Sequence, residues 1–166
     1  MTTRESVLIK LLDCGTADLS VLDDIEYDLD NIIDECLGDN DVSLHGILRR
    51  VFYQAAGDLC CRFDDKTDEI RESIIKALDE EKDFVANGHM TQEDLEECPE
   101  HKQLVKDLEL LDNNLLHPDV DMQFYLNYLD THVSVKHIDF YRRYMEDEVE
   151  EVERNMGFEF EEWNNW

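Results

Sequence analysis

Hydrophobic residues recur at steps of three and four along most of this 166-residue chain, and that spacing predicts amphipathic α-helices. The clearest stripe lies within residues 20–37. Its members are Leu22, Ile25, Leu29, Ile32, Ile33 and Cys36. Most of the positions between them are acidic or small polar residues. We therefore predict one helix over residues 20–37, with an apolar face toward the core and a strongly negative face toward water.

Short capping and breaking motifs indicate where the other helices begin and end. Thr2 and Glu5 form a capping box for a first helix, and Ser43 caps the most hydrophobic helix, which we expect to be central. Residues 64–67, an Asp-Asp-Lys-Thr sequence, predict a turn and a new cap. The Asn87–Gly88 pair predicts the next helix end.

Two prolines divide the second half of the chain, because proline suits only the first turn of a helix. Pro99 interrupts a short helix capped by Thr91 and begins another, and Pro118 opens a further segment. A last long helix is expected over residues 134–156, closed by Gly157. The predicted fold class is all-α, a single compact bundle-like domain of about seven or eight helices.

Chain length and composition support one domain over residues 1–157, followed by a short aromatic–acidic tail over 158–166. The chain is long enough to bury a core without metal or disulfide crosslinks. Hydrophobic residues make up 42% of it and glycine and proline total only eight, which argues against disorder despite the high charge.

The charge balance changes this picture, because the chain has 43 acidic residues but only 15 basic ones. Its formal net charge is −28. Residues 11–48 contain eleven carboxylates and no lysine or arginine. A sequence shaped for stability would place lysine four positions after an acid, as Glu72 and Lys76 do. The unrelieved repulsion predicts that compensating cations come from a partner. A generic acidic, soluble protein is the alternative.

A second acidic segment, residues 146–162, carries nine carboxylates against Arg154. The two segments, together with the tryptophans of the tail, define the candidate partner-binding residues. These are Asp23, Asp24, Glu26, Asp28, Asp30, Asp34, Glu35, Asp39, Asp41, Glu146, Asp147, Glu150, Glu151, Glu153, Glu159, Glu161, Glu162, Trp163 and Trp166.

The aromatic residues of the tail allow three interpretations. Phe158, Phe160, Trp163 and Trp166 either fold back onto the core, because apolar rings bury strongly, or form an exposed hook. In the hook, the rings would anchor on a basic partner toward which the neighbouring acids steer. Homodimerisation through the tail is the third interpretation.

Motifs for catalysis, metals and cofactors are missing, so we assign no catalytic residue, metal ligand or cofactor. The six glycines form no phosphate-binding loop, and no GxSxG or HExxH sequence occurs. A calcium loop that began at Asp39 would have Leu44 and Arg50 where glycine and glutamate are required. Cys98 and His101 have no second pair with zinc-site spacing.

The expected location is the cytoplasm. The N-terminal sequence runs straight into an amphipathic pattern rather than an apolar signal segment, and no stretch approaches a transmembrane span. A surface this acidic is repelled by anionic lipids, and we expect neither membrane binding nor direct nucleic-acid binding. The five cysteines lack CxxC spacing, which fits reduced thiols.

In charge, size and helical character the chain resembles the DNA-mimic inhibitors of phages and mobile elements, including anti-restriction and anti-CRISPR proteins. The resemblance covers the whole chain as composition and architecture, and it assigns no residue roles. It implies a viral, non-catalytic protein that blocks the basic nucleic-acid channel of a nuclease or CRISPR effector in the host cytoplasm. An immunity protein that neutralises a nuclease toxin is a related alternative.

A catalytic alternative comes from two acidic pairs. Glu93 and Glu96, followed by Glu109 and Asp112, resemble the ExxE and ExxD motifs with which all-α NTP pyrophosphohydrolases bind magnesium. The resemblance implies magnesium-dependent hydrolysis of nucleotides. Pro99 leaves the first pair on a very short helix, and other acid pairs in the chain share the spacing, so the prediction remains a non-enzyme.

Overall fold

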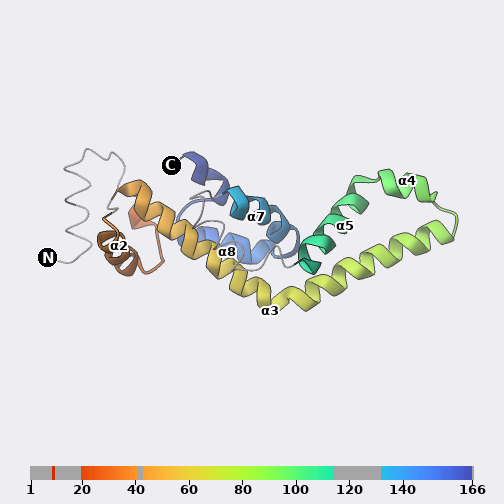
Figure 1. The fold of residues 1–166 in the computed structure, drawn as a ribbon, viewed down its shortest axis with the longest axis horizontal. Helices are drawn as coiled ribbons and strands as arrows, with labels where there is room; N and C mark the ends of the chain where they lie inside the picture. The colour runs from red at the N-terminus through yellow and green to blue at the C-terminus, as the bar shows by residue number, and fades with distance from the viewer. Residues whose placement is uncertain (1–8, 10–19, 41–42, 114–131, 166) are drawn as a thin grey trace. The chain divides into compact units, whose positions relative to one another are not determined.

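The computed structural model describes residue 9 and residues 20–40, 43–113 and 132–165. In this part of the chain the structure is helical and contains no strand, which confirms the all-α prediction (Figure 1). The elements are η1 (Ser20–Asp23), α2 (Leu29–Gly38), α3 (Leu44–Ala86), α4 (Gln92–Glu97), α5 (Pro99–Asp112), α7 (His132–Tyr144), α8 (Glu146–Met156) and η2 (Phe160–Asn165).

The described ranges thus contain six α-helices, rather than the seven or eight expected for the chain. The helix predicted at Thr2 and the segment that opens at Pro118 lie outside the described residues. None of the described helices combines the length and the apolar character that crossing a bilayer requires.

Packing of the backbone divides the chain into two compact units. Unit 1 comprises Met1–Leu59 and Met145–Trp166, and unit 2 comprises Cys60–Tyr144. Helix α3 contributes residues to both units. The predicted single domain over 1–157 stays a prediction, and the tail belongs to unit 1 together with α8.

The apolar stripe of residues 20–37 lies in the core of unit 1, but the single helix predicted there is wrong. All six members of the stripe are buried, yet they come from η1, a connecting loop and α2. Asp28 begins α2, because its carboxylate accepts a hydrogen bond from the N–H of Asn31 at 3.3 Å. The N–H of Glu26 instead bonds to the carbonyl of Asn155 at 2.8 Å, which holds the loop outside a helical path.

Helix α3 runs unbroken through residues 64–67, where the sequence predicts a turn, so that prediction is wrong. The Thr67 hydroxyl donates to the Phe63 carbonyl at 3.0 Å, one helical turn earlier, instead of capping a new helix. The buried side chains of Phe63, Ile70 and Ile74 continue the apolar face across the acidic sequence. The predicted Ser43 cap is confirmed, because its Oγ accepts the N–H of Gly46 at 3.0 Å.

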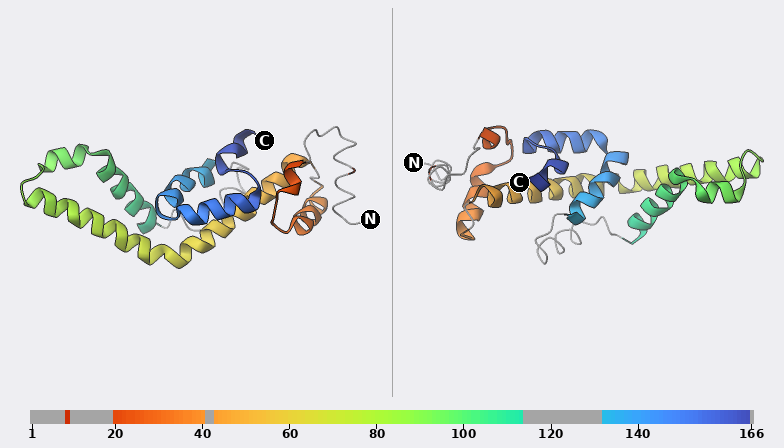
Figure 2. Two further views of the ribbon diagram at one scale, coloured as in Figure 1. Left: turned by 180° about the vertical axis from the view of Figure 1, so that it is seen from behind. Right: turned by 90° about the horizontal axis from the view of Figure 1, so that it is seen from above.

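The predicted boundaries around α4 and α5 are confirmed. Helix α3 ends at Ala86, and Gly88 follows with a φ of 79°. Thr91 caps α4 by accepting the N–H of Asp94 at 3.1 Å, and Pro99 begins α5. Within unit 2, α4 and α5 turn back along the C-terminal half of α3 (Figure 2).

A hydrogen bond and an ion pair join the returning helix to α3. His101 Nδ1 lies 2.6 Å from Glu81 Oε2, and the Arg71 guanidinium pairs with Asp112. Deeper in unit 2, the fully buried carboxylate of Asp107 accepts bonds from Arg143 at 2.6 and 3.1 Å and from the Tyr144 hydroxyl at 2.8 Å. Burial and the adjacent Asp107 carboxylate raise the pKa of Tyr144 above its usual value.

The long helix predicted over 134–156 is two helices, α7 and α8, so that prediction is also wrong. Met145 separates them with φ −143° and ψ 42°, outside the helical region, although its side chain is buried. Three acids in the first turn of α8 favour a helix start there, because carboxylates stabilise the positive end of the helix dipole. The predicted stop at Gly157 is confirmed by its φ of 76°.

Candidate protein-interaction surface

The carboxylates predicted to bind a partner are, with few exceptions, exposed. The acidic surface of unit 1 is defined here as the exposed members of that set. They are Asp23, Asp24, Glu26, Asp28, Asp30, Asp34, Glu35, Asp39, Glu146, Asp147, Glu150, Glu151, Glu159, Glu161 and Glu162. All of them fall in unit 1, whose sequence holds 22 acidic residues and five lysines or arginines.

Two contacts bring the two acidic segments together, although they are more than a hundred residues apart in sequence. The backbone N–H of Glu26 donates to the carbonyl of Asn155 at 2.8 Å. Gly157 lies against Asp24, so closely that a Cβ atom on Gly157 would be 3.0 Å from the Asp24 Cβ. The loop after η1 and the C-terminal end of α8 therefore bring the two acidic segments side by side at this point within unit 1.

Gly157 is required at this junction for two separate reasons. Its φ of 76° is a backbone conformation that residues other than glycine rarely adopt. Its neighbour across the junction is Asp24 backbone, with the carbonyl carbon and oxygen both 3.1 Å from the Cβ position. Neither atom can move aside as the end of a flexible side chain would.

Gly157→Ala should therefore destabilise the protein by about 2–3 kcal/mol, as the sum of conformational strain and a clash with backbone. Gly88→Ala is the matched control, because Gly88 also has a positive φ of 79° but open space at its Cβ position. It should cost only about 1 kcal/mol. Urea unfolding followed by circular dichroism measures both, and equal losses would contradict the close contact at Asp24.

Part of the lysine- and arginine-free run of residues 11–48 is paired with a cation. Arg50, on α3, pairs with Asp39 and lies 3.8 Å from Glu35, so the expectation that no cation relieves these acids is wrong for this end of the surface. The pairs are exposed and contribute at most about 1 kcal/mol. The spacing of Asp23, Asp30 and Asp34 predicts a row of carboxylates along one helix, and this prediction is also wrong, since Asp23 lies in η1 and only the other two share α2.

Glu153 does not belong to the exposed surface, contrary to its place among the predicted residues. Its side chain is buried and accepts a hydrogen bond from the N–H of Phe160 at 2.9 Å. This bond ties η2 to α8. Asp41 and the side chains of Trp163 and Trp166 lie outside the described residues, so their predicted roles stay predictions.

The first half of the tail folds back onto unit 1. Phe158 and Phe160 are buried, and the Phe160 ring meets Phe52 of α3 edge to face, with ring centroids 5.2 Å apart. The acids beside them, Glu159, Glu161 and Glu162, remain exposed. For these two phenylalanines the folded-back interpretation is therefore confirmed.

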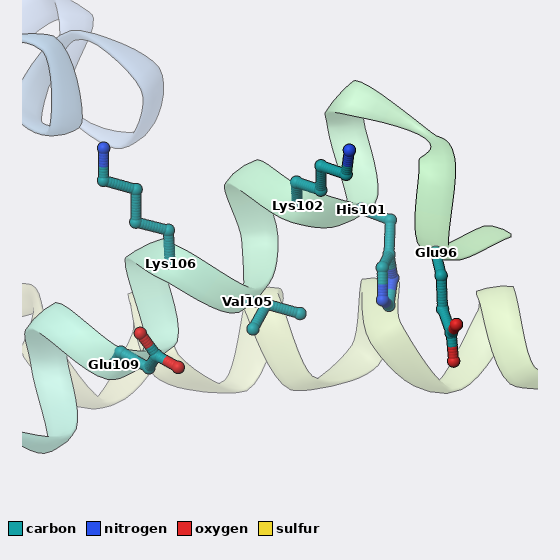
Figure 3. Close-up of a pocket in the computed structure, with 6 residues that line it drawn as sticks. All are labelled: Glu96, His101, Lys102, Val105, Lys106 and Glu109. Atoms are coloured by element: carbon teal, nitrogen blue, oxygen red, sulfur yellow. The ribbon is translucent and has the colours of Figure 1, made fainter.

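In the described ranges, no three or more side chains of the metal-binding types converge on one point. Glu96 and Glu109, from the two magnesium-type pairs, border a hollow of about 310 Å³, where His101 and Val105 lie between them (Figure 3). Asp112 pairs with Arg71. Within the described residues, the acids of the two pairs therefore do not gather at one point, as the resemblance would imply.

Cys98 and His101, weighed as zinc ligands, each face a different carboxylate. The Cys98 thiol donates to Glu100 at 2.9 Å, and this bond is the main reason that the pKa of Glu100 lies below its usual value. The His101 ring pairs with Glu81. The two residues thus stabilise the turn between α4 and α5 and its attachment to α3.

Comparison of the chain with protein-family models, curated proteins and solved structures found no match. Function is therefore inferred from the chemistry of the surface itself.

Sequence reasoning identified the two acidic segments but missed the residues that join them. Asn155 and Gly157 were recognised only as the end of a helix, because nothing in a local pattern reveals a neighbour more than a hundred residues away. Arg50 was missed because it reaches α2 from the following helix, a contact that depends on how the two helices pack. Its position soon after the lysine- and arginine-free run was the one available signal.

Proposed function

We propose that this protein is a non-catalytic inhibitor whose acidic surface binds the basic nucleic-acid-binding surface of another protein and excludes the nucleic acid. The observation that carries the proposal is the joining of two acidic segments at Asp24–Gly157 and Glu26–Asn155. Unit 1 holds 22 acidic residues against five basic ones and unit 2 holds 21 against ten, so the acids of unit 1 are the less compensated.

The electrostatic cost of this surface supports the same conclusion. Asp30 and Asp34 are four residues apart on α2, which places their side chains about 5–6 Å from each other on one helix face. Such like-charge pairs destabilise the helix, and no basic residue occurs within α2 to offset them. Lysines and arginines arranged for phosphates would supply the missing counter-charge and replace mutual repulsion by attraction.

The partner class follows from the chemistry that the surface offers. A rigid set of carboxylates on folded backbone can occupy a groove lined with lysine and arginine without being a substrate for cleavage. Nucleases and RNA-guided effectors, which hold their nucleic acids in such grooves, are the proposed partners. A phage-encoded inhibitor of host defence would act in this way in the host cytoplasm.

A competition assay tests the proposal. Fluorescently labelled duplex DNA is bound to each member of a panel comprising a restriction nuclease, an RNA-guided nuclease and a toxin-type nuclease, and the protein is titrated in. Release of the duplex from at least one of them is expected. Binding without release would identify an immunity-type complex away from the groove, and no binding to any member would count against the proposal.

Asp30→Lys combined with Asp34→Lys should weaken the binding about tenfold or more, because two attractive contacts become repulsive. The doubly neutral variant, Asp30→Asn with Asp34→Asn, should give an intermediate loss. The matched control is Asp64→Lys with Asp65→Lys, which changes the net charge equally but lies on the unit 2 part of α3. Equal losses from the two lysine pairs would show that only net charge matters.

A further inference from the structure

Unit 2 carries a second feature, an apolar groove, that the acidic surface of unit 1 does not explain. A hollow of about 370 Å³ lies between the C-terminal end of α3, helix α4 and the start of α5. Its apolar lining comes from Ala77, Phe84, Met90 and Leu95. A volume of this size is near the lower end of ligand-binding pockets, and it accommodates one large side chain together with its neighbours.

Phe84 shows that this lining is not ordinary core. Half of its side-chain surface is exposed, although it is among the largest apolar residues in the chain. Its ring packs against the His89 ring, with centroids 4.8 Å apart, which holds it at the groove rather than in the interior. Leu95, by contrast, is buried and lines the same hollow. An exposed aromatic residue beside an apolar hollow is typical of a binding surface.

The charge around the groove determines what kind of partner fits it. Glu80 and Glu81 border the hollow directly. Residues 79–100, which include every lining residue except Ala77, contain nine carboxylates against Lys82. The Glu81 carboxylate already contacts the His101 ring, whereas the Glu80 side chain is exposed to solvent. An apolar floor beneath an acidic border favours a partner that is apolar at one point and positively charged around it.

We propose that this groove is a docking site for a protein segment in which one large apolar side chain is flanked by lysines or arginines. The apolar side chain would enter the hollow beside Phe84 and displace water, as the anchors of peptide-binding grooves do. The flanking cations would pair with Glu80 and the neighbouring acids. The site goes beyond the function proposed for unit 1, because none of its residues belongs to that surface.

Cys98 gives a site-specific measurement in the full-length protein. Its side chain borders the groove and is partly exposed, whereas Cys61, on the unit 2 part of α3, is exposed outside it. The probe is a synthetic helical peptide of leucine and lysine, and alkylation of each cysteine by iodoacetamide is followed by mass spectrometry. At saturating peptide we expect slower alkylation of Cys98 and an unchanged rate at Cys61. A peptide with glutamine in place of each leucine should protect neither.

Two variants test whether the contact is made in the groove. Phe84→Ala should weaken peptide binding at least about fivefold, because it removes the anchor's main contact. Ile75→Ala is the control, since Ile75 is similarly exposed on the same helix but lies outside the groove. Glu80→Gln should weaken binding, and Glu72→Gln, an exposed acid earlier on α3, should not.

Three results would overturn the proposal. The first is an unchanged alkylation rate at Cys98 when the peptide is added, and the second is equal effects of Phe84→Ala and Ile75→Ala on peptide binding. The third is slower alkylation of Cys98 at higher protein concentration when no peptide is present. The last result would assign the groove to a second copy of the chain. The Asp30→Lys, Asp34→Lys variant should retain full Cys98 protection. Failure of this site and failure of the acidic surface are therefore measured separately.

Discussion

Replacing Phe160 with alanine should lower the free energy of unfolding by about 3–5 kcal/mol, the usual range for removing a fully buried aromatic ring. The ring is completely buried and meets Phe52 edge to face, so its loss leaves a cavity and removes an aromatic pair. The residue lies only six positions from the end of the sequence. An effect of this size would establish that the tail is part of the unit 1 core.

The matched control for Phe160 is Phe84→Ala, in which a half-exposed ring is removed from unit 2. Its cost should stay below about 1.5 kcal/mol, because much of the ring is already in contact with water. Guanidinium chloride unfolding followed by circular dichroism gives both values. A Phe160→Ala loss no larger than that of the control would contradict the folded-back tail.

Asp107→Ala should have the second large effect, a loss of about 2–4 kcal/mol. Removing one member of a buried ion pair usually costs about 3–5 kcal/mol, and this range is reduced here because about a third of the Arg143 side chain is exposed and partly screened by water. The substitution also removes the acceptor for the Tyr144 hydroxyl and for the side-chain amide of Gln103. The bonds from Arg143 and Tyr144 join α5 to α7 within unit 2, whereas Gln103 lies on α5 itself.

Asp112→Ala provides the comparison on the same helix. Asp112 also pairs with an arginine, Arg71, but the Asp112 side chain is about half exposed. Its loss should therefore change the free energy of unfolding by less than about 1 kcal/mol. If the two substitutions had similar costs in urea unfolding, the buried network around Asp107 would not be the contact that holds α5 against α7.

Apolar spacing predicted which residues are buried better than it predicted where helices break. The stripe that ends at Cys36 is buried as expected. The apolar positions spaced along the predicted helix over 134–156 are buried too: Ile138, Tyr141, Met145, Val149, Val152 and Met156. Each set is nevertheless divided by a break that the spacing does not reveal. At Asp28 the break depends on a side-chain cap, and at Met145 on a local backbone turn that keeps the side chain in the core. The same apolar spacing occurs whether the segment is one continuous helix or two elements separated by a break.

The opposite error occurred at residues 64–67, where polar composition predicted a turn that does not exist. Buried residues on both sides, Phe63 and Ile70, remain on one helical face, and packing of that face outweighs the weak helix preference of the intervening aspartates. Cap motifs with a specific hydrogen bond, such as Ser43 and Thr91, were predicted correctly because their chemistry is local.

Composition identified the acids of the candidate surface, but not how they are arranged. Exposure of Asp30 and Asp34 follows from their positions opposite the apolar stripe of α2. The burial of Glu153 could not be predicted, because it depends on a backbone N–H supplied by the tail at Phe160. The meeting of Asp24 with Gly157 likewise depends on tertiary packing.

The most direct test of the central claim is the salt dependence of binding to the nucleic-acid-binding protein identified by the competition assay. Dissociation constants are measured between about 50 and 200 mM potassium chloride, a range over which screening strongly weakens contacts between exposed charges. The wild type and the Asp64→Lys, Asp65→Lys control should show the same steep weakening, and the Asp30→Lys, Asp34→Lys variant a clearly shallower one. Affinity that does not change with salt, or one slope shared by all three proteins, would contradict binding through the acidic surface of unit 1.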